Sequence, residues 1–237
     1  GMNAALKVQK KPEFVLRRDE AYIGVLIDDL ITKGTEEPYR MFTSRAEYRT
    51  LLRQDNADLR LTPKSFALGL ASEERMKRVV EKQKKTDLFI EFLKKTSIRP
   101  EDVNDLLKGK NTATINQSMK MFKVAARPQL NFEDVRKFPL VETFITEHDI
   151  DEEIIEQTEI HVKYSGYIEK EKNSADKLQR LENIKIPEGF DYFKVKSLSF
   201  EAREKLTKIQ PATISQASRI SGVSPSDVSV LLVYMGR

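Results

Sequence analysis

The sequence predicts a mainly α-helical fold. The chain has 237 residues, of which only nine are glycine and none is tryptophan, a composition that argues against a β-sandwich or barrel. From residue 44 onward, nearly every apolar pattern repeats at intervals of three and four residues, which is the period of an amphipathic helix. Apolar residues make up 39% of the chain and charged residues 33%, so we expect several packed helices with large solvated faces.

The composition also excludes several kinds of site. With no cysteine, this segment contains no disulfide, no thiolate metal site and no cysteine nucleophile. No apolar run approaches ~18 residues, so the sequence predicts no membrane-spanning helix. It contains no signal peptide, and we expect a cytoplasmic protein. The formal net charge is only +4, so any affinity for nucleic acid must come from local clusters of basic residues.

The first predicted helix spans about Tyr22 to Leu30 and follows a short extended segment, with Gly34 ending it. It carries two adjacent carboxylates, Asp28 and Asp29. Adjacent side chains on a helix point in different directions, so a surface pair or an arginine partner is favoured over a metal site.

An arginine-rich helix is predicted to start at Arg45. Ser44 and Glu47 have the spacing of a capping box. On this helix Arg45, Arg49 and Arg53 would share one face, which suits phosphate recognition because the guanidinium fork matches phosphate oxygens. The alternative is that these arginines pair with nearby carboxylates. The residues involved would be Glu47, Asp55 and Asp58, and the helix would bury Tyr48, Leu51 and Leu52.

A second charged helix is predicted over residues 72–96. Ser72 is its N-cap. Its buried stripe is predicted to begin with Met76, Val79 and Val80 and to continue with Phe89, Phe92 and Leu93. Its outer face is basic, so it either follows an RNA backbone or is a solvated face balanced by Glu81 and Glu91. The basic residues are Lys77, Arg78, Lys82, Lys84 and Lys85.

Three short helices are expected within residues 100–145, and one or two long helices within 149–185. Pro100 begins the first short helix, the second covers Ser118 to Ala126, and Asn131 with Asp134 caps the third. The long segment has an apolar stripe at Ile160, Tyr164, Tyr167 and Ile168. His148 and His161 lack companions at ligand spacing, so we expect no metal site.

Residues 197–237 form a predicted three-helix unit with N-caps at Ser199, Thr213 and Ser224. Its spacing is also that of a helix-turn-helix, with Gly222 in the turn, so a DNA-binding regulator is the alternative function. The first turn of the presumed recognition helix contains Pro225, Ser226 and Asp227, which offer no bidentate contact to a base. DNA binding is therefore the less favoured alternative.

Long blocks of the sequence resemble the glucose-inhibited division protein A family (GidA, also MnmG). The first block runs from Arg18 through Thr62, and shorter blocks follow near the C-terminus. They are Tyr164-Ser165-Gly166-Tyr167-Ile168 and Gln216-Ala217-Ser218-Arg219-Ile220-Ser221-Gly222-Val223. Residues 63–163 resemble the family in the type of residue at each position more than in residue identity.

This resemblance implies a function in tRNA modification. The family protein is the FAD-dependent half of the enzyme that adds a 5-carboxymethylaminomethyl group to the wobble uridine of tRNA. The resemblance also implies a homodimer that uses NADH as reductant and works with a GTPase partner, MnmE. Its C-terminal helical region, which this chain resembles, is implied to hold tRNA and the GTPase.

The flavin-binding part of the family has no counterpart here. The chain contains no G-x-G-x-x-G motif, so no cradle for a pyrophosphate is predicted. Gly1-Met2-Asn3-Ala4-Ala5 resembles the last residues of a flavin-domain motif, and Gly1-Met2 is equally consistent with a scar of tag removal. We expect a C-terminal fragment that is inactive alone, with no catalytic residue, no cofactor site and no metal site.

The expected organisation has three segments. Residues 1–62 would be the tail of the FAD domain with the arginine-rich junction helix, residues 63–165 a helical domain, and residues 166–237 a C-terminal helical subdomain. Two groups of binding residues are predicted on them. We expect RNA contacts from Tyr39, Arg40, Phe42, Arg45, Arg49, Arg53 and Arg60, with the two rings either stacking on bases or packing in the core. We expect partner contacts from Gln216, Arg219, Ser221 and Gly222.

Overall fold

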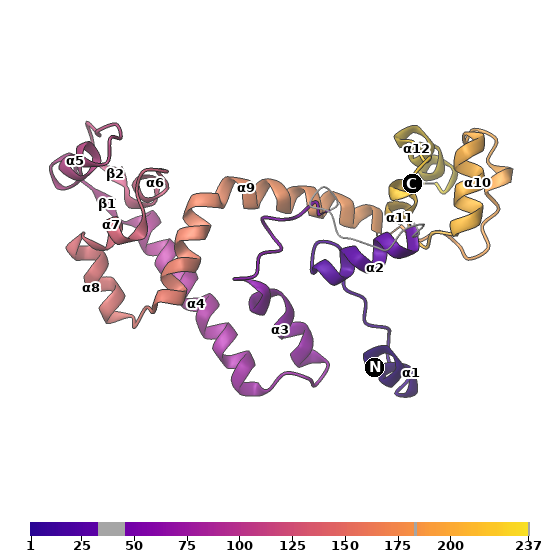
Figure 1. Cartoon of the computed structure of the whole chain (residues 1–237), viewed down its shortest axis with the longest axis horizontal. Coiled ribbons are helices and arrows are strands. Elements are labelled where there is room, and N and C mark those ends of the chain that lie inside the picture. Colours follow the sequence, from indigo (N-terminus) through magenta and orange to yellow (C-terminus); the bar gives the residue numbers. More distant parts are fainter. Residues whose placement is uncertain (33–45, 183, 237) are drawn as a thin grey trace. The chain divides into compact units, whose positions relative to one another are not determined.

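The computed structural model describes residues 1–32, 46–182 and 184–236, and their regular structure is almost entirely helical (Figure 1). Two-residue strands, β1 (Ser97–Ile98) and β2 (Met119–Lys120), pair antiparallel. The predicted helical fold is confirmed. The helices are α1 (Met2–Val8), α2 (Tyr22–Thr32), α3 (Ala57–Ala67), α4 (Glu73–Lys95), α5 (Pro100–Gly109), α6 (Met121–Ala125), α7 (Phe132–Arg136), α8 (Pro139–Glu147), α9 (Glu152–Glu182), α10 (Phe200–Ile209), α11 (Ile214–Arg219) and α12 (Pro225–Tyr234).

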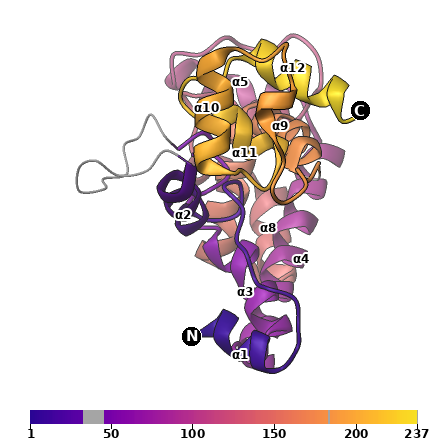
Figure 2. The same ribbon diagram turned by 90° about the vertical axis from the view of Figure 1, so that its right-hand side faces the viewer.

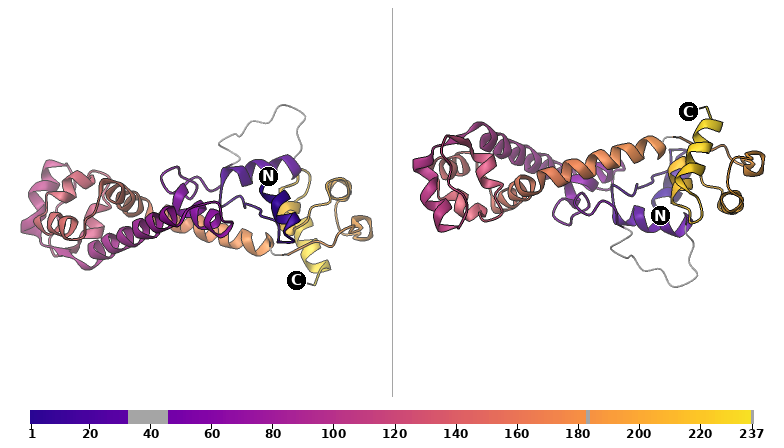
Figure 3. Two further views of the ribbon diagram at one scale, coloured as in Figure 1. Left: turned by 90° about the horizontal axis from the view of Figure 1, so that it is seen from below. Right: turned by 90° about the horizontal axis from the view of Figure 1, so that it is seen from above.

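The chain divides into two compact units. We call residues 53–169 the central unit, and residues 1–52 together with 170–237 the terminal unit. Helix α9 contributes residues to both units and is continuous over its 31 residues (Figure 3). The three segments expected from the sequence are a different division, and their limits stay a prediction.

The central unit has one continuous apolar core. Aromatic rings form its middle: the centroids of Phe92 and Phe144 lie 4.1 Å apart in a stacked arrangement, and Phe89 meets Phe132 edge to face at 6.0 Å. Phe89 and Leu93 are fully buried, as expected from the stripe on α4. The prediction was wrong for Val80, which is 53% exposed. Ser72 caps α4 by accepting a hydrogen bond from the Arg75 amide.

The short helices of the central unit follow the sequence signals with two differences. Pro100 begins α5, and Asn131 with Asp134 forms the capping box of α7. The helix expected over Ser118 to Ala126 is shorter, because Met119 and Lys120 pair with β1 instead. The third helix ends at Arg136, and Pro139 then starts α8, which the sequence analysis did not separate.

The last three helices of the terminal unit, α10 to α12, pack around a common apolar core (Figure 2). Their predicted N-caps at Ser199, Thr213 and Ser224 are all present. The core begins earlier than residue 197, because Ile186 and Tyr192 are buried in it. The amide of Ile186 also donates to the Ala212 carbonyl at 2.9 Å. The compact bundle therefore includes residues from 186 onward.

The prediction of a helix that starts at Arg45 is wrong for the described residues after it, because residues 46–56 are not helical. Residues 47–50 form a turn and the next helix, α3, starts only at Ala57, while Ser44 and Arg45 lie outside the described residues. The reason is a competing acceptor, since the carboxylate of Glu171 accepts the amides of Thr50 and Leu51 at 2.9 and 3.1 Å. Tyr48 and Leu52 are buried as predicted, so the apolar spacing is satisfied by a single turn.

Candidate nucleic-acid interface

Of the three described arginines predicted to bind RNA, Arg49 is exposed and the other two, Arg53 and Arg60, are half-buried. The side chain of Arg49 makes no hydrogen bond or ion pair with the residues that the structure describes. It follows directly from the buried Tyr48, whose burial fixes the turn that presents it. Tyr39, Arg40, Phe42 and Arg45, the other predicted members before it, lie outside the described residues.

Arg53 and Arg60 are held in place by neighbouring groups of the central unit. Arg53 Nε lies 3.0 Å from Asp55 Oδ1, so the pairing alternative holds for this residue. Arg60 donates to Asn56 Oδ1 and to the Arg53 carbonyl, both at 2.9 Å. Burial would raise the pKa of the Asp55 carboxyl, but hydrogen bonds from Arg53 and Gln157 hold it below its usual range. Both guanidinium groups therefore sit in fixed orientations.

The other two carboxylates expected to pair with these arginines have different partners. Glu47 pairs with Arg18 at 2.9 Å and Asp58 with Lys82 at 3.0 Å. Among the described residues, these two carboxylates thus have partners from segments that are distant in the sequence, and their predicted pairing with the nearby arginines stays a prediction. Sequence spacing does not show partners that arrive from another segment.

The basic face predicted on α4 is mostly engaged within the central unit. Lys82 is only 6% exposed, and its ammonium lies 2.8 Å from Glu153 and 3.0 Å from Asp58. Burial alone would lower the pKa of Lys82, but the hydrogen bonds that its ammonium donates to these carboxylates raise it instead. Arg78 pairs with Glu153 and Lys85 with Asp149. Of the five basic residues, Lys77 and Lys84 are exposed and make no side-chain contact with described partners.

A cleft of about 830 Å³ lies beside Lys82. Four carboxylates and two cations line it, so its lining has a net negative charge that disfavours phosphate. Its charged lining residues are Asp55, Asp58, Glu153, Glu156, Arg75 and Lys82.

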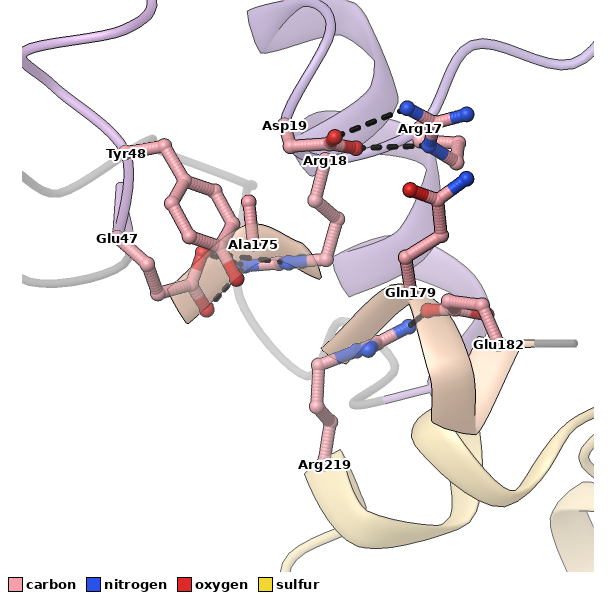
Figure 4. Close-up of a pocket in the computed structure, with 9 residues that line it drawn as sticks. All are labelled: Arg17, Arg18, Asp19, Glu47, Tyr48, Ala175, Gln179, Glu182 and Arg219. Atoms are coloured by element: carbon pink, nitrogen blue, oxygen red, sulfur yellow. Dashed lines mark hydrogen bonds and ion pairs between the residues drawn. The ribbon is translucent and has the colours of Figure 1, made fainter. Parts of the chain in front are cut away.

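A buried charge network in the terminal unit centres on Arg18, which is 7% exposed (Figure 4). One end of its guanidinium lies 3.0 Å from Asp28 and 2.8 Å from Asp29, and the other end 2.9 Å from Glu47. The arginine partner expected for Asp28 and Asp29 is thus confirmed. The sequence analysis missed Arg18 itself, because no local pattern marks an arginine that will be buried.

The start of α2 explains how Arg18 reaches these carboxylates. A Cβ atom at Gly24 would lie 2.3 Å from the Arg17 carbonyl oxygen, so only glycine allows the helix to approach the preceding segment this closely. This close approach places Arg18 beside the carboxylate-bearing side of α2. The Arg18 Nη1 also donates to the Val25 carbonyl at 3.4 Å.

Arg219, predicted to bind a partner, belongs to the same network. It makes a two-pronged pair with Asp28, both N–O distances being 2.8 Å, and a further contact with Glu182 at 2.9 Å. Figure 4 shows its guanidinium directed at Glu182. Asp28 therefore bridges Arg18 and Arg219, which come from opposite ends of the sequence.

The remaining residues predicted to contact a partner differ in how exposed they are to one. The side-chain oxygen of Gln216 accepts the Ala212 amide at 2.8 Å, so this group is used within the bundle. Gly222 has φ +93°, and a Cβ there would lie 2.4 Å from the Glu201 carboxylate. Ser221 is exposed. The structure thus leaves Ser221 and the adjoining turn as the accessible part of the predicted set.

Paired charges surround a small cavity of about 90 Å³ in this network (Figure 4). Tyr48 lines it, and burial together with the nearby Glu47 raises the pKa of its hydroxyl to about 12. The hydroxyl is therefore protonated at neutral pH. The arginines and carboxylates that line the cavity neutralise one another. Their ion pairs hold the segments around the cavity together, so we assign them a structural role.

The bundle does not present a DNA-reading helix. Asp227 is 4% exposed, and its carboxylate accepts the Ser199 amide at 2.8 Å and the Ser224 amide at 2.9 Å. Burial would raise the pKa of Asp227, but these hydrogen bonds lower it. The exposed residues before it, Pro225 and Ser226, carry no group for a bidentate base contact. The DNA-binding alternative is not favoured.

No helix among the described residues is both long and apolar enough to cross a membrane. Residues 1–32, 46–182 and 184–236 also contain no group of three or more histidine or acidic residues arranged to hold a metal ion.

Comparison with known proteins gives consistent matches over the whole chain. The family model of the tRNA modifying enzyme MnmG/GidA C-terminal helical domain matches residues 73–172, and that of the MnmG/GidA C-terminal helical bundle matches residues 174–237. Two curated relatives are named tRNA uridine 5-carboxymethylaminomethyl modification enzyme MnmG. The one from Christiangramia forsetii is 68% identical and the one from Flavobacterium psychrophilum 62% identical, each over all 237 residues.

The chain covers only part of these proteins, 38% of the length of either curated relative. Two crystal forms of Aquifex aeolicus GidA share its fold. Form II gives a TM-score of 0.79 at 40% identity and covers 100% of this chain and 36% of the GidA chain. Form I gives 0.77 at 42% identity, covering 99% and 35%. The chain therefore belongs to the MnmG/GidA family of tRNA-modifying enzymes and represents its C-terminal helical region.

Proposed function

We propose that this chain is the tRNA- and partner-binding region of an FAD-dependent enzyme that adds a 5-carboxymethylaminomethyl group to the wobble uridine of tRNA. The observation that carries the proposal is its similarity, over all 237 residues, to relatives named for this modification. The chain matches only the C-terminal helical part of the family, so we assign it binding and not chemistry. The cytoplasm, where tRNA is modified, is the proposed location.

The described residues do not fit a flavin. A pyrophosphate cradle needs consecutive backbone amides in a glycine-rich turn at the start of a helix. The described glycines with positive φ are isolated at turns, and the space around Gly24 is filled by backbone. FAD, and NADH as its reductant, are therefore assigned to the part of the family polypeptide that this chain does not span.

The proposed RNA surface is formed by the arginines between residues 40 and 60. Arg49 is exposed, and Arg53 and Arg60 are pre-oriented by Asp55 and Asn56, which lowers the entropy cost of meeting a phosphate. Tyr39, Arg40, Phe42 and Arg45 complete the proposed set.

A salt titration of tRNA binding tests this surface. Each phosphate contact adds roughly 0.7 to 0.9 to the slope of log affinity against log salt. Arg49→Gln should lower the slope by about that amount without changing stability, because its side chain is exposed. Arg180→Gln, which removes an exposed charge from α9 of the same unit, is the matched control and should leave the slope unchanged. Equal slopes for the parent and Arg49→Gln would reject the assignment.

The proposed GTPase partner, MnmE, would dock on the C-terminal bundle near Ser221 and Gly222, with Gln216 and Arg219 supporting this surface from within. The bundle core extends from residue 186, so removing residues 197–237 would expose that core. A loss of binding by this deletion variant could then not be distinguished from a loss of folding. Point variants avoid this. Ser221→Arg should abolish capture of the GTPase in a pull-down, whereas Ser229→Arg, on an exposed part of α12, should not. Homodimerisation is proposed for the whole enzyme.

A further inference from the structure

Two exposed phenylalanines lie beside one arginine on the C-terminal bundle. Phe193 is 47% exposed and Phe200 is 63% exposed. The guanidinium carbon of Arg203 lies over both rings, 5.8 Å from each ring centroid, which is within the range of a cation–π contact. All three residues belong to the terminal unit, so this group of side chains, which we call the Phe–Arg cluster, is contained in one compact unit.

The guanidinium of Arg203 lacks a polar partner. It makes no hydrogen bond or ion pair with any residue that the structure describes, although its Nε atom is buried. Helix α10 supplies no carboxylate at the positions three and four residues from Arg203, where an ion pair on one helix would form. These positions hold Ser199, Phe200, Leu206 and Thr207. Arg18 and Arg219 of the same unit, by contrast, pair with carboxylates. A covered cation without a polar partner costs free energy, which a carboxylate supplied from outside would recover.

The backbone that carries the Phe–Arg cluster is fixed by the core of the bundle. Tyr192, the residue before Phe193, is fully buried in that core. Phe200 is the first residue of α10, whose Ala202 and Leu206 are also fully buried there. The rings are therefore held on a rigid surface, and little conformational entropy would be lost when a partner binds to them.

The surroundings of the Phe–Arg cluster favour a protein over RNA as its occupant. Glu201 and Glu204 are exposed and directly follow Phe200 and Arg203 on α10, and the exposed Lys205 comes next. A nucleic acid brings a phosphate with every nucleotide, and the two carboxylates would repel it. Aromatic rings and an arginine inside a rim of mixed charge are the composition of a protein–protein interface.

The Phe–Arg cluster adjoins the surface proposed above for the GTPase. A Cβ on Gly222 would lie 2.4 Å from the Glu201 carboxylate, so the start of α10 packs against the turn that contains Ser221 and Gly222. Phe200 is the residue before Glu201. The surface near Ser221 therefore continues onto α10 and reaches the exposed rings.

We propose that Phe193, Phe200 and Arg203 bind a segment of the GTPase partner in which a carboxylate lies next to an apolar side chain. The carboxylate supplies the missing partner of Arg203, and the apolar side chain covers the two rings. This inference rests on the proposed docking of the GTPase, and it adds the contact residues and the chemistry of the segment that they bind.

Titration of the 237-residue chain with the purified GTPase tests the role of Arg203, with the dissociation constant as the readout. Arg203→Gln removes the charge and keeps a good helix former. We expect this variant to bind about tenfold to a hundredfold more weakly, because the carboxylate of the partner is left unpaired. Arg203→Glu should bind more weakly still, since it places two negative charges together. Equal losses for the two variants would contradict a carboxylate in the bound segment.

The rings are tested in the same titration by the double variant Phe193→Ala, Phe200→Ala, for which we expect a loss of similar size. Both side chains are largely exposed, so the bundle core is not opened by this change. Lys205→Gln removes an exposed cation from the same helix and is the matched control for Arg203→Gln. It should bind the GTPase like the parent.

Tyr164 and Tyr167 on α9 provide the matched control for the rings. They are 51% and 67% exposed, and their ring centroids lie 6.4 Å apart. The apolar stripe predicted from Ile160 to Ile168 was therefore wrong for both tyrosines, because Ile155 and Val162 lie in the core of the central unit instead. The double variant Tyr164→Ala, Tyr167→Ala removes two exposed rings from the other unit and should leave binding of the GTPase intact.

Melting curves establish that each variant is folded. If Ser221→Arg loses the GTPase while the Arg203 and phenylalanine variants bind it at the parent's strength, the Phe–Arg cluster is overturned and the proposed docking near Ser221 remains. If these variants lose affinity for tRNA and keep affinity for the GTPase, the occupant is RNA and the inference is also overturned. If the parent chain does not bind the GTPase, the proposed partner function fails together with this inference.

Discussion

The core of the central unit and the junction around α2 in the terminal unit are stabilised by different forces. The central unit buries a continuous set of apolar side chains contributed by α4 to α9. At the α2 junction, the buried apolar cluster formed by the described residues consists of Val25, Tyr48, Leu52 and Ala175, with Leu51 beside it. The rest of that junction is the ion-pair network of Arg18 and Arg219.

The two regions differ in how strongly their stability depends on the exact positions of the interacting groups. Apolar burial is non-directional, so a core tolerates repacking when its volume is kept. A buried ion pair needs near-ideal geometry, because its desolvation is costly when one partner is lost. The α2 junction should therefore be more sensitive to a single polar substitution than the central core is to a comparable apolar one.

The largest expected effect is from Arg18→Ala. Removing the guanidinium takes away the ion pair that Arg18 makes with Asp29, which is 1% exposed, whereas Asp28 still pairs with Arg219. We expect a loss of about 3–5 kcal/mol in unfolding free energy. Hydrogen exchange should show α2 losing protection while α4 keeps it. Arg18→Lys, which retains charge but not the fork, should recover only part of the loss. Equal loss of protection in both helices would remove the contrast between the two regions.

In the central core, Leu93→Ala is the comparable test. Leu93 is fully buried, so we expect a loss of about 3 kcal/mol from transfer and cavity terms. Protection should fall in α4 and remain in α2. Leu93→Met, which nearly conserves volume, should cost less than about 1.5 kcal/mol. If the Leu93→Met variant were as unstable as the Leu93→Ala variant, the stability of this core would also depend on the exact shape of its side chains.

The buried carboxylate of Asp134 provides a test of whether the stability of the central unit also depends on a buried charge. Burial would raise the pKa of its carboxyl, but hydrogen bonds from Lys110, Lys137 and the Asn131 amide lower it to about 2. Since the unfolded pKa is about 3.9, this carboxylate stabilises the fold fully above that pH, and the contribution of about 2 kcal/mol disappears as the pH falls toward 2. Denaturation of Asp134→Asn across this range should show a shallower loss of stability than the parent. Parallel pH profiles would contradict this.

The smallest expected effect is a gain from Tyr192→Phe in the C-terminal bundle. The Tyr192 side chain is fully buried, and its hydroxyl has no hydrogen-bond partner among the described residues. Burial raises its pKa to about 12. Removing the hydroxyl keeps the ring packing and should raise stability by about 1 kcal/mol, seen as a higher melting temperature. A lower melting temperature would mean that the hydroxyl is satisfied in solution.

Local signals in the sequence were sufficient for the starts of the capped helices. Ser72, Asn131 and Ser224 each cap the helix that the sequence predicts after them, because a cap depends on residues within one turn. The apolar stripe of α4 was also predictable apart from Val80, since its period persists over several turns. The helix expected from Arg45 was not formed over the described residues, because Glu171, more than 100 positions away, takes the amides of Thr50 and Leu51.

The candidate sites were less predictable than the helices, for the same physical reason. Arg49 is exposed, which is compatible with the RNA contact predicted for it from the sequence, and that contact stays a prediction. Arg18 and the pairing of Arg219 depend on segments brought together only by the fold. Which side of α9 carries its exposed rings likewise depended on which of two apolar stripes the core selected.

The bridge between Asp28 and Arg219 has a consequence for biosynthesis. The two residues are separated by 191 positions in the sequence. At a translation rate of roughly 5–20 residues per second, Asp28 waits about 10–40 seconds for Arg219 to be made. The central unit is complete well before then, and its local contacts favour rapid folding. We therefore expect nascent chains to acquire the central core first, while the acidic turn of α2 stays exposed until synthesis reaches the C-terminal bundle.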